Sequence, residues 1–368
     1  SGIDHMFGEG GIDTLSYQLS TAGITISLAD PSINKGDAAG DIYSGFEDVT
    51  GTNYDDVIYG DSQPVNNLWG LAGNDKIYGG DGYDVMIGDA GADYLDGGAG
   101  RDEADYETSP EAITISLADP SMNTGHGVGD VYVNIEDLAG SLYDDKLYGD
   151  AQGNNILGWP GNDQIFGGDG DDGLDGGPGA DILDGQGGID TVGYGSAGKA
   201  EGYSASYTQL GVGVTASLLD PSINTGDARG DRYFNVENLM GSDFADILHG
   251  DNQNNVVLGQ SGSDQLFGQG GDDLLEGGAG ADALNGGAGF DKASYDRSTQ
   301  GVAASLLTPS TNTGDAAGDT YSSIEGILGS RFNDLLGGDN LDNRLVGAEG
   351  DDTLIGNGGD DFLYGGRG

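Results

Sequence analysis

The chain has 368 residues, of which 63 are acidic and only 12 are lysine or arginine, so that its formal net charge is −51. Such a surface excludes nucleic acids and anionic membranes as partners and attracts cations. There is no cysteine for disulfides or thiolate metal sites, and no apolar run is long enough to insert into a membrane.

Glycine and aspartate recur along the chain with a period of nine residues. From Gly70 the sequence reads GLAGNDKIY, GGDGYDVMI, GDAGADYLD and GGAGRDEAD, with glycine at positions one and four and aspartate at position six. The same frame returns from Gly158, Gly259 and Gly347, and position eight is usually aliphatic. Glycine at this density prevents helix and favours turns, whereas the last three residues of each nine suit a short strand.

Blocks of nines, here called cassettes, alternate with spacers that also recur. The spacer cores are DPSINKGDAAGDIYSGFED (30–48), DPSMNTGHGVGDVYVNIED (119–137), DPSINTGDARGDRYFNVEN (220–238) and TPSTNTGDAAGDTYSSIEG (308–326). Both ends of the sequence fall inside a nine, so we expect the natural protein to continue in both directions. In chain order we predict the end of an upstream roll (1–16), spacer 1 (17–50), cassette 1 (51–105), spacer 2 (106–139), cassette 2 (140–193), spacer 3 with an insertion near 196–208 (194–240), cassette 3 (241–294), spacer 4 (295–328) and a truncated cassette 4 (329–368).

The predicted fold is all-β. Two turn–strand units make one coil of a flattened solenoid, and stacked coils give a parallel β-roll with four calcium-binding cassettes separated by β-rich spacers. One aliphatic side chain per nine should point inward: Ile77, Met86, Leu95, Ile165, Leu174, Leu183, Val192, Leu266, Leu275, Leu284, Leu354 and Leu363.

The composition also predicts an ion. Ordering a glycine-rich nine costs more free energy than burying its single aliphatic side chain returns, and stacked aspartates add repulsion. Glycine turns expose carbonyl oxygens and aspartates add carboxylates, whereas the chain has only three histidines. Such all-oxygen sites favour calcium over magnesium or zinc, so we expect calcium binding and folding to be one event.

The frame GGxGxDxUx (U, a large aliphatic residue), as in GGDGYDVMI and GGAGADALN, resembles the calcium-binding repeats of the RTX (haemolysin-type) proteins. The resemblance implies a parallel β-roll in which calcium lies between turns two nines apart, held by carbonyls and position-six aspartates. It also implies secretion by a bacterial type I system and folding outside the cell, where calcium is abundant, and hence an extracellular or cell-surface location.

Motif position then nominates the calcium ligands. Position six holds Asn154, Asn255 and Asn343 in three looser nines, a departure that weakens or abolishes those sites. The alternative for any single aspartate is a turn-stabilising role. The nominated residues are Asp75, Asp84, Asp93, Asp102, Asp163, Asp172, Asp181, Asp190, Asp264, Asp273, Asp282, Asp291, Asp352 and Asp361, with Asp4, Asp13, Asp56, Asp145, Asp246 and Asp334 beside them.

The spacers leave two interpretations open. Their acids could form a second type of cation site together with Glu47, Glu237 and Glu325, or they could be solvated links between rolls; the second is slightly favoured. His126 stands where the other copies have aspartate, so spacer 2 should bind calcium more weakly if that position is a ligand. The recurring Tyr43, Tyr132, Tyr233 and Tyr321 are interpreted as packing anchors. The spacer acids concerned are Asp37, Asp41, Asp130, Asp227, Asp231, Asp315 and Asp319.

No HExxH, GxSxG, P-loop or Cys–His pairing is present, so we predict no catalytic role. The favoured function is a structural or adhesive region of a large secreted bacterial protein: an adhesin, surface-layer or filament component. Its expected partners are calcium ions, with self-association or a cell-surface polysaccharide as candidates. The alternative is a calcium-dependent folding and secretion module of a protease, lipase or polysaccharide epimerase. An ice-binding roll ranks last, because regular outward Thr/Asn rows are missing.

Overall fold

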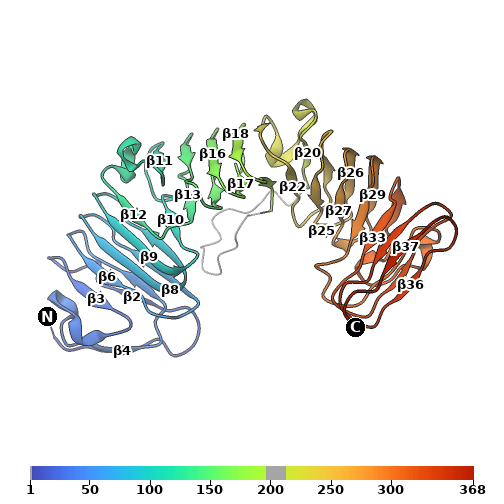
Figure 1. Cartoon of the computed structure of the whole chain (residues 1–368). Helices are drawn as coiled ribbons and strands as arrows, with labels where there is room; N and C mark the ends of the chain where they lie inside the picture. Colours follow the sequence, from blue (N-terminus) through green and yellow to red (C-terminus); the bar gives the residue numbers. More distant parts are fainter. Residues whose placement is uncertain (1, 196–212) are drawn as a thin grey trace. The chain divides into compact units, whose positions relative to one another are not determined.

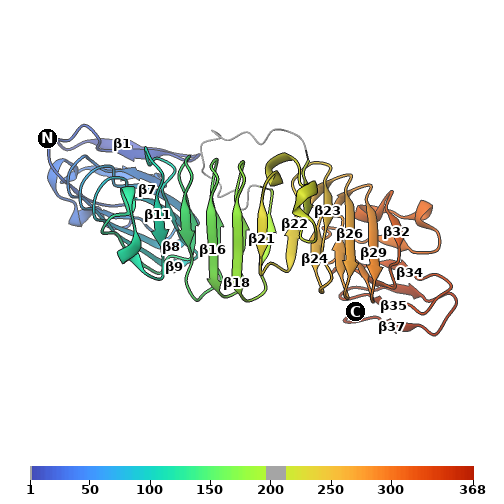
Figure 2. The ribbon, with the colours of Figure 1, turned by 90° about the horizontal axis from the view of Figure 1, so that it is seen from above.

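The computed structural model describes residues 2–195 and 213–368. These residues form two compact units, the first ending at residue 188 and the second beginning at residue 189. In the described ranges the regular structure consists of short β-strands and single-turn 3₁₀ helices, with no α-helix (Figures 1 and 2). The strands of successive coils pair in parallel, so the predicted all-β parallel roll is confirmed. The insertion predicted near 196–208 lies outside the described residues.

The first unit has two sheet faces, which the nines supply alternately. On the first face the ladder is interrupted at the spacers, whereas on the second it is continuous. The first face contains β1 (His5–Phe7) with β4 (Ile42–Ser44); β3 (Thr25–Ser27), β6 (Val57–Tyr59), the first half of β8 (Lys76–Ile87), β9 (Tyr94–Gly100) and β12 (Val131–Val133); and β11 (Thr114–Ser116), β14 (Lys146–Tyr148), β16 (Gln164–Asp169) and β18 (Ile182–Gly187). The second face contains β2 (Thr14–Ser16), β5 (Asp48–Thr50), β7 (Val65–Trp69), the second half of β8, β10 (Glu103–Asp105), β13 (Asp137–Ala139), β15 (Asn155–Leu157) and β17 (Gly173–Asp175).

The second unit repeats this arrangement. Its first face contains β20 (Thr215–Ser217), β23 (Ile247–His249), β26 (Gln265–Gly270), β29 (Ala283–Ala288) and β32 (Thr320–Ser322), then β31 (Ala303–Ser305), β34 (Leu335–Gly337) and β36 (Thr353–Ile355). Its second face contains β19 (Thr191–Gly193), β22 (Asn238–Met240), β24 (Val256–Leu258), β27 (Leu274–Glu276), β30 (Lys292–Ser294), β33 (Gly326–Leu328), β35 (Arg344–Val346) and β37 (Phe362–Tyr364). Three further strands complete the set: β21 (Arg232–Phe234) and the two-residue strands β25 (Ser261–Gly262) and β28 (Ala279–Gly280).

The core lies between the two faces and consists mainly of the middle residues of the strands. Ten of the twelve residues predicted to point inward are at most 1% exposed, which confirms them: Ile77, Met86, Leu95, Ile165, Leu174, Leu183, Val192, Leu266, Leu275 and Leu284. The prediction is wrong for Leu363, which is 45% exposed, and Leu354 is only half-buried. Leu363 lies on β37, which pairs on one side with β35 and has no described strand on its other side.

Each spacer folds as a strand, two single 3₁₀ turns and a second strand. In spacer 1 the side chain of Asp30 accepts a hydrogen bond from the backbone N–H of Ser32 at the start of η1 (Pro31–Ile33). Asn34 then joins the segment together, because its Oδ1 accepts from the N–H of Ser27 at 2.9 Å and its Nδ2 donates to the Tyr43 hydroxyl at 2.7 Å. The other 3₁₀ turns are η2 (Gly36–Ala38), η3 (Pro120–Met122), η4 (Gly125–Gly127), η5 (Pro221–Ile223), η6 (Gly226–Ala228), η7 (Pro309–Thr311) and η8 (Gly314–Ala316).

Among the described residues, no helix has the length and apolar character needed to cross a membrane.

Candidate metal sites

The position-six aspartates lie at the two edges of the roll, where the chain turns from one face to the other. Those that precede first-face strands define the first edge, and those that precede second-face strands define the second edge. Most of them are fully buried: Asp75, Asp84, Asp93 and Asp102 are each at most 1% exposed. Of the remaining predicted ligands, Asp4 is exposed and Asp13, Asp352 and Asp361 are half-buried, whereas these are buried: Asp56, Asp145, Asp163, Asp172, Asp181, Asp190, Asp246, Asp264, Asp273, Asp282, Asp291 and Asp334.

On the first edge these aspartates form a hydrogen-bonded ladder. The backbone N–H of Asp56 donates to Oδ1 of Asp75 at 2.8 Å, and the N–H of Asp75 donates to Oδ1 of Asp93 at 2.8 Å. The last rung belongs to the spacer, because the N–H of Asp93 donates to Oδ1 of Asp130, also at 2.8 Å. Each carboxylate is therefore fixed by the coil before it.

The second edge carries a matching ladder. The N–H of Asn66 donates to Oδ1 of Asp84 at 3.0 Å, and the N–H of Asp84 donates to Oδ1 of Asp102 at 2.9 Å. Here the spacer supplies a glutamate, since the N–H of Asp102 donates to Oε2 of Glu136 at 3.0 Å. The pattern recurs in the later cassettes, through Asp163, Asp172, Asp181, Asp264, Asp273, Asp282, Asp291, Asp352 and Asp361.

In several of these aspartates the second carboxylate oxygen has no hydrogen-bond donor. In Asp75, Asp84, Asp93 and Asp102 the Oδ2 atom is buried without a partner. Burial without compensation raises the pKa of Asp75 to about 7 and that of Asp93 to about 8. A buried carboxylate is costly unless a donor or a cation faces it. The same orphaned oxygen occurs in Asp13, Asp264, Asp273, Asp282, Asp291 and Asp352.

Glycine at position one keeps the space beside each orphaned oxygen free. A Cβ atom on Gly79 would lie 2.4 Å from Oδ2 of Asp84 and 2.5 Å from the carbonyl oxygen of Gly97 in the next coil. A carboxylate oxygen and a carbonyl oxygen from successive coils therefore face the same small region. Any side chain would fill that region, so the position requires glycine. This donor set is the one that calcium prefers.

The carboxylates do not gather in clusters. In the ranges that the structure describes, no three His, Cys, Asp or Glu side chains lie close enough together to hold a metal ion. A cation at these edges would accordingly depend on backbone carbonyls in addition to one or two aspartates. The donor set fits calcium, which accepts carbonyl oxygens readily, better than zinc.

The first aspartate of each cassette differs from those that follow. Oδ2 of Asp56 accepts a hydrogen bond from the backbone N–H of Thr52 at 2.5 Å, which leaves this carboxylate fully satisfied. Serine takes the place of threonine in the later cassettes, where Ser141, Ser242 and Ser330 bond Asp145, Asp246 and Asp334.

The asparagines at position six begin the ladder on the second edge. Nδ2 of Asn154 donates to the carbonyl oxygen of Glu136 at 2.8 Å, and Nδ2 of Asn255 donates to that of Glu237 at 2.6 Å. The amide N–H group of the asparagine thus faces the carbonyl oxygen, in the position that a cation would otherwise take. The same bond is formed by Asn66 and Asn343.

The spacer aspartates join the ladder through one carboxylate oxygen, and their second oxygen accepts a hydrogen bond from a tyrosine. Oδ2 of Asp130 accepts a hydrogen bond from the hydroxyl of Tyr106 at 2.6 Å, and that hydroxyl also contacts the hydroxyl of Tyr132. Burial raises the pKa of Tyr106 well above its ordinary value, so the phenol keeps its proton and remains a donor. The equivalent bonds join Tyr17 to Asp41, Tyr194 to Asp231 and Tyr295 to Asp319.

The structure does not bring the remaining spacer acids into one site. Asp41 accepts from the N–H of Asp4, whereas Glu47 accepts from the N–H of Asp13 on the other edge of the roll. Oδ2 of Asp315 accepts from the hydroxyl of Ser298, and His126 lies 3.7 Å from Oδ1 of Asp89. Asp37, Asp227 and Asp315 lie in the 3₁₀ turns η2, η6 and η8.

Sequence reasoning missed a second, exposed ladder at position five. Here the side chain accepts from the following coil: Oδ1 of Asp55 binds the N–H of Asn74 at 2.9 Å, and Oδ1 of Asn74 binds that of Ala92 at 3.1 Å. The direction is opposite to that of the position-six ladder. The frequent Asp or Asn at position five was the available signal, as in Asp144, Asn254, Asp272, Asn333 and Asp342.

Parallel coils with buried carboxylate ladders at both edges define a calcium-binding β-roll. A family model described as the RTX calcium-binding nonapeptide repeat (4 copies) matches residues 42–63, 69–104, 135–165, 160–192, 236–266, 258–293 and 337–368, together more than half of the chain. The chain therefore belongs to this family, and its repeats bind calcium ions. Repeats of this family are typical of secreted proteins and are usually structural. No curated protein matches the chain.

Proposed function

We propose that this chain is a calcium-dependent structural or adhesive region of a large secreted bacterial protein, folded only where calcium is available. The observation that carries the proposal is the row of buried, orphaned Oδ2 atoms at both edges. A row of buried carboxylates would repel one another and resist burial unless cations neutralised them. Calcium bound there would supply charge neutralisation and link successive coils.

The proposed ligands are the position-six aspartates inside each cassette, together with carbonyl oxygens of the glycine turns. In the first cassette these are Asp75 and Asp93 on the first edge and Asp84 and Asp102 on the second edge. Asp56 and Asn66, which begin the two ladders, already have protein partners. Their satisfied groups favour calcium sites in the interior of each cassette rather than at its start.

The proposed location is the cell surface or the extracellular medium, and the proposed role is mechanical or adhesive. Four cassettes joined by spacers repeat the same surface along the chain, which suits an adhesin, surface-layer or filament component. Self-association or contact with a cell-surface polysaccharide would then be the second interaction, besides calcium.

The test is a calcium titration of the purified chain, followed by circular dichroism and calorimetry. Cooperative folding into β-structure should appear only as calcium is added, and chelation should reverse it. A chain that remains cooperatively folded in excess chelator would contradict the proposal.

A matched pair of variants at neighbouring residues tests the assignment of the ligands to position six. Asp273 is 1% exposed with an orphaned Oδ2, whereas Asp272 is exposed at position five. Asp273→Asn should remove a charged ligand and shift the calcium midpoint of folding to higher concentration, with fewer ions bound. Asp272→Asn removes the same charge but keeps the acceptor oxygen, so its midpoint should change little. Equal shifts in the two variants would refute the assignment of position six.

A further inference from the structure

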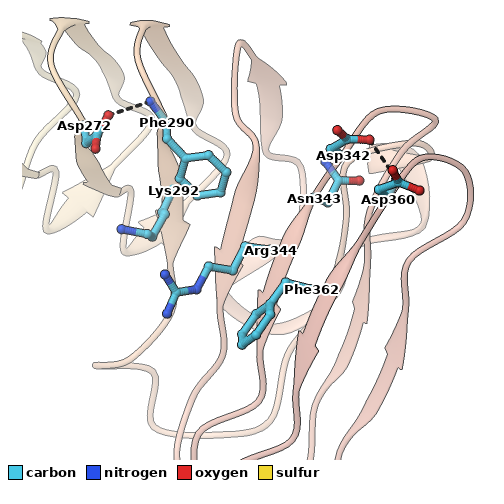
Figure 3. A pocket seen from close by; sticks show the side chains of 8 residues that line it. All are labelled: Asp272, Phe290, Lys292, Asp342, Asn343, Arg344, Asp360 and Phe362. Atoms are coloured by element: carbon cyan, nitrogen blue, oxygen red, sulfur yellow. Dashed lines mark hydrogen bonds between the residues drawn. The ribbon is translucent and has the colours of Figure 1, made fainter.

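A hollow of about 390 Å³ lies on the outer side of the second face in the second unit (Figure 3). Its walls carry two basic side chains, Lys292 and Arg344, and two aromatic rings, Phe290 and Phe362. Its size is that of a small-ligand site. Basic side chains are rare in this chain, with 12 lysines and arginines against 63 acidic residues, so two of them on one hollow are unusual, even with aspartates beside them.

The register of the strands places the two basic residues of the hollow in one row. Lys292 on β30 pairs with Gly326 on β33, and Gly326 pairs with Arg344 on β35. The three residues occupy one row across the face, with glycine in the middle. Because Gly326 has no side chain, its neighbours lie over it: a Cβ atom there would be 3.0 Å from Cγ of Lys292 and 3.5 Å from the ring of Phe290.

In spacer 2, the same row has a polar side chain at the position of Gly326. The position of Gly326 is taken there by Asp137, which pairs with Glu103 and with Asn155. Arg101 holds the Asp137 carboxylate through Nε at 2.8 Å and through its terminal nitrogen at 2.7 Å. Asp48 and Asn238 occupy the position in the other two spacers. Three copies thus fill the position with their own carboxylate or amide, whereas the fourth does not.

The two basic side chains around Gly326 contact aromatic rings, and the charge of Lys292 also acts on the neighbouring Asp291. Within the described residues neither Lys292 nor Arg344 forms an ion pair or a side-chain hydrogen bond. They lie instead over aromatic rings: Lys292 Nζ is 5.9 Å from the centre of Phe290, and the Arg344 guanidinium carbon is 5.2 Å from that of Phe362. Cation–π contact leaves the N–H groups of these side chains free to donate to a ligand.

The rim of the hollow restricts the charge of that ligand. Asp272, Asp342 and Asp360 also line it, and Figure 3 shows Asp272 beside Phe290, with Asp342 and Asp360 together across the hollow and away from Lys292. One oxygen each of Asp272 and Asp342 accepts a backbone N–H bond, at 2.9 and 2.7 Å. Their other oxygens can accept hydrogen bonds from hydroxyl groups but repel further anions. The rim therefore disfavours multiply charged anions and acidic peptides.

We propose that this hollow binds a sugar acid, a ligand with one carboxylate and several hydroxyl groups. Lys292 and Arg344 donate hydrogen bonds to its carboxylate from the two sides of the hollow. The rim aspartates accept its hydroxyl protons, and the rings of Phe290 and Phe362 contact its C–H surface. The site gives the adhesive role proposed above a ligand class, and in its biological meaning it rests on that proposal.

The test uses the full chain saturated with calcium and glucuronate as the probe, with binding measured by isothermal titration calorimetry. Glucuronate should bind, whereas glucose, which lacks the carboxylate, and N-acetylaspartate amide, which stands for an acidic peptide, should bind at least tenfold more weakly. Absence of glucuronate binding, or equal binding of either comparison compound, would overturn the proposal.

Variants locate the site and separate it from calcium folding. Lys292→Gln and Arg344→Gln should each weaken glucuronate binding at least tenfold, and Gly326→Asp should weaken it by supplying an internal carboxylate. Lys146→Gln, which removes an exposed basic residue of the first unit, is the matched control and should bind normally. All four should keep the calcium-induced circular dichroism change, so a failure of the ligand site is distinguishable from a failure of calcium folding. Unchanged affinity in Lys292→Gln and Arg344→Gln would overturn the assignment.

Discussion

The cassettes and the spacers build the same ladder but satisfy it differently. Asp93 in a cassette and Asp130 in the following spacer each accept one backbone N–H bond through Oδ1. The second oxygen of Asp93 has no protein donor, whereas that of Asp130 accepts the Tyr106 hydroxyl at 2.6 Å. A phenol proton in the spacer therefore takes the role that we propose for a cation in the cassette.

The start of each cassette uses two further substitutes for the cation. On the first edge the N–H of Ser242 bonds Asp246, and on the second edge the amide of Asn255 bonds a carbonyl. Each run of calcium sites is thus bounded by donors that belong to the protein. The comparison indicates that single residues decide whether a carboxylate or carbonyl of the ladder faces a protein donor or is left for a cation.

Calcium removal is the experiment with the largest expected effect. It tests whether the spacers, whose carboxylates have tyrosine donors, depend on calcium as the cassettes do. Because spacer carboxylates accept their N–H bonds from cassette aspartates, the spacers should unfold with the cassettes when calcium is chelated. Hydrogen exchange measured by mass spectrometry should show loss of protection in peptides from residues 70–105 and 113–139 alike. Spacer peptides that stay protected would mean that the tyrosine-bonded segments fold independently.

Removal of one phenol hydroxyl should have a smaller effect. Tyr295→Phe leaves Oδ2 of Asp319 buried without a donor, which costs about 1–3 kcal/mol of the free energy of unfolding at saturating calcium. Urea denaturation measures this loss. Tyr59→Phe is the control, because Tyr59 stacks on Tyr78 with ring centres 4.7 Å apart and its change should lie within about 0.5 kcal/mol. Similar losses of unfolding free energy in both variants would show that the hydrogen bond from Tyr295 to Asp319 contributes nothing specific to stability.

Conversion of an asparagine into an aspartate should have the smallest effect on stability and sharpens the comparison most. Asn255→Asp replaces the amide donor to the Glu237 carbonyl by a carboxylate, which recreates the arrangement of a cassette interior. Calorimetry should count one additional calcium ion per chain, with a change in unfolding free energy at saturating calcium of about 1 kcal/mol or less. An unchanged stoichiometry would show that a carboxylate at position six is not sufficient for a site.

The sequence was a good guide to the roll and a poorer one to its boundaries. A period of nine with one aliphatic residue predicts the inward rows, because every coil repeats the same burial, and Leu266 and Leu284 follow it. Leu363 does not, since burial in a solenoid depends on a neighbouring coil that the residue itself does not specify. The tyrosine bonds escaped prediction because Tyr106 and Asp130 are 24 residues apart and belong to different local patterns.

The sequence predicted which residue types form the candidate sites, but not which of the aspartates have a protein donor for their second oxygen. Asp56 and Asp75 occupy the same position of the repeat, yet one is satisfied by Thr52 and the other has an orphaned oxygen. The hollow at Gly326 had a visible signal, because the spacer cores end in Asp48, Asp137, Asn238 and Gly326. Its meaning required the strand register, which places the missing side chain between Lys292 and Arg344.

The opposed directions of the two side-chain ladders have a mechanical consequence. Position-six side chains bind the coil before them, and position-five side chains bind the coil after them, as at Asp75 and Asp55. Each pair of such neighbouring coils is joined by side-chain hydrogen bonds that run in both directions. Tension along the roll therefore loads several short hydrogen bonds at once. A cassette under force should resist stretching as a stack and then yield one coil at a time, with bound calcium setting the load at which each coil opens.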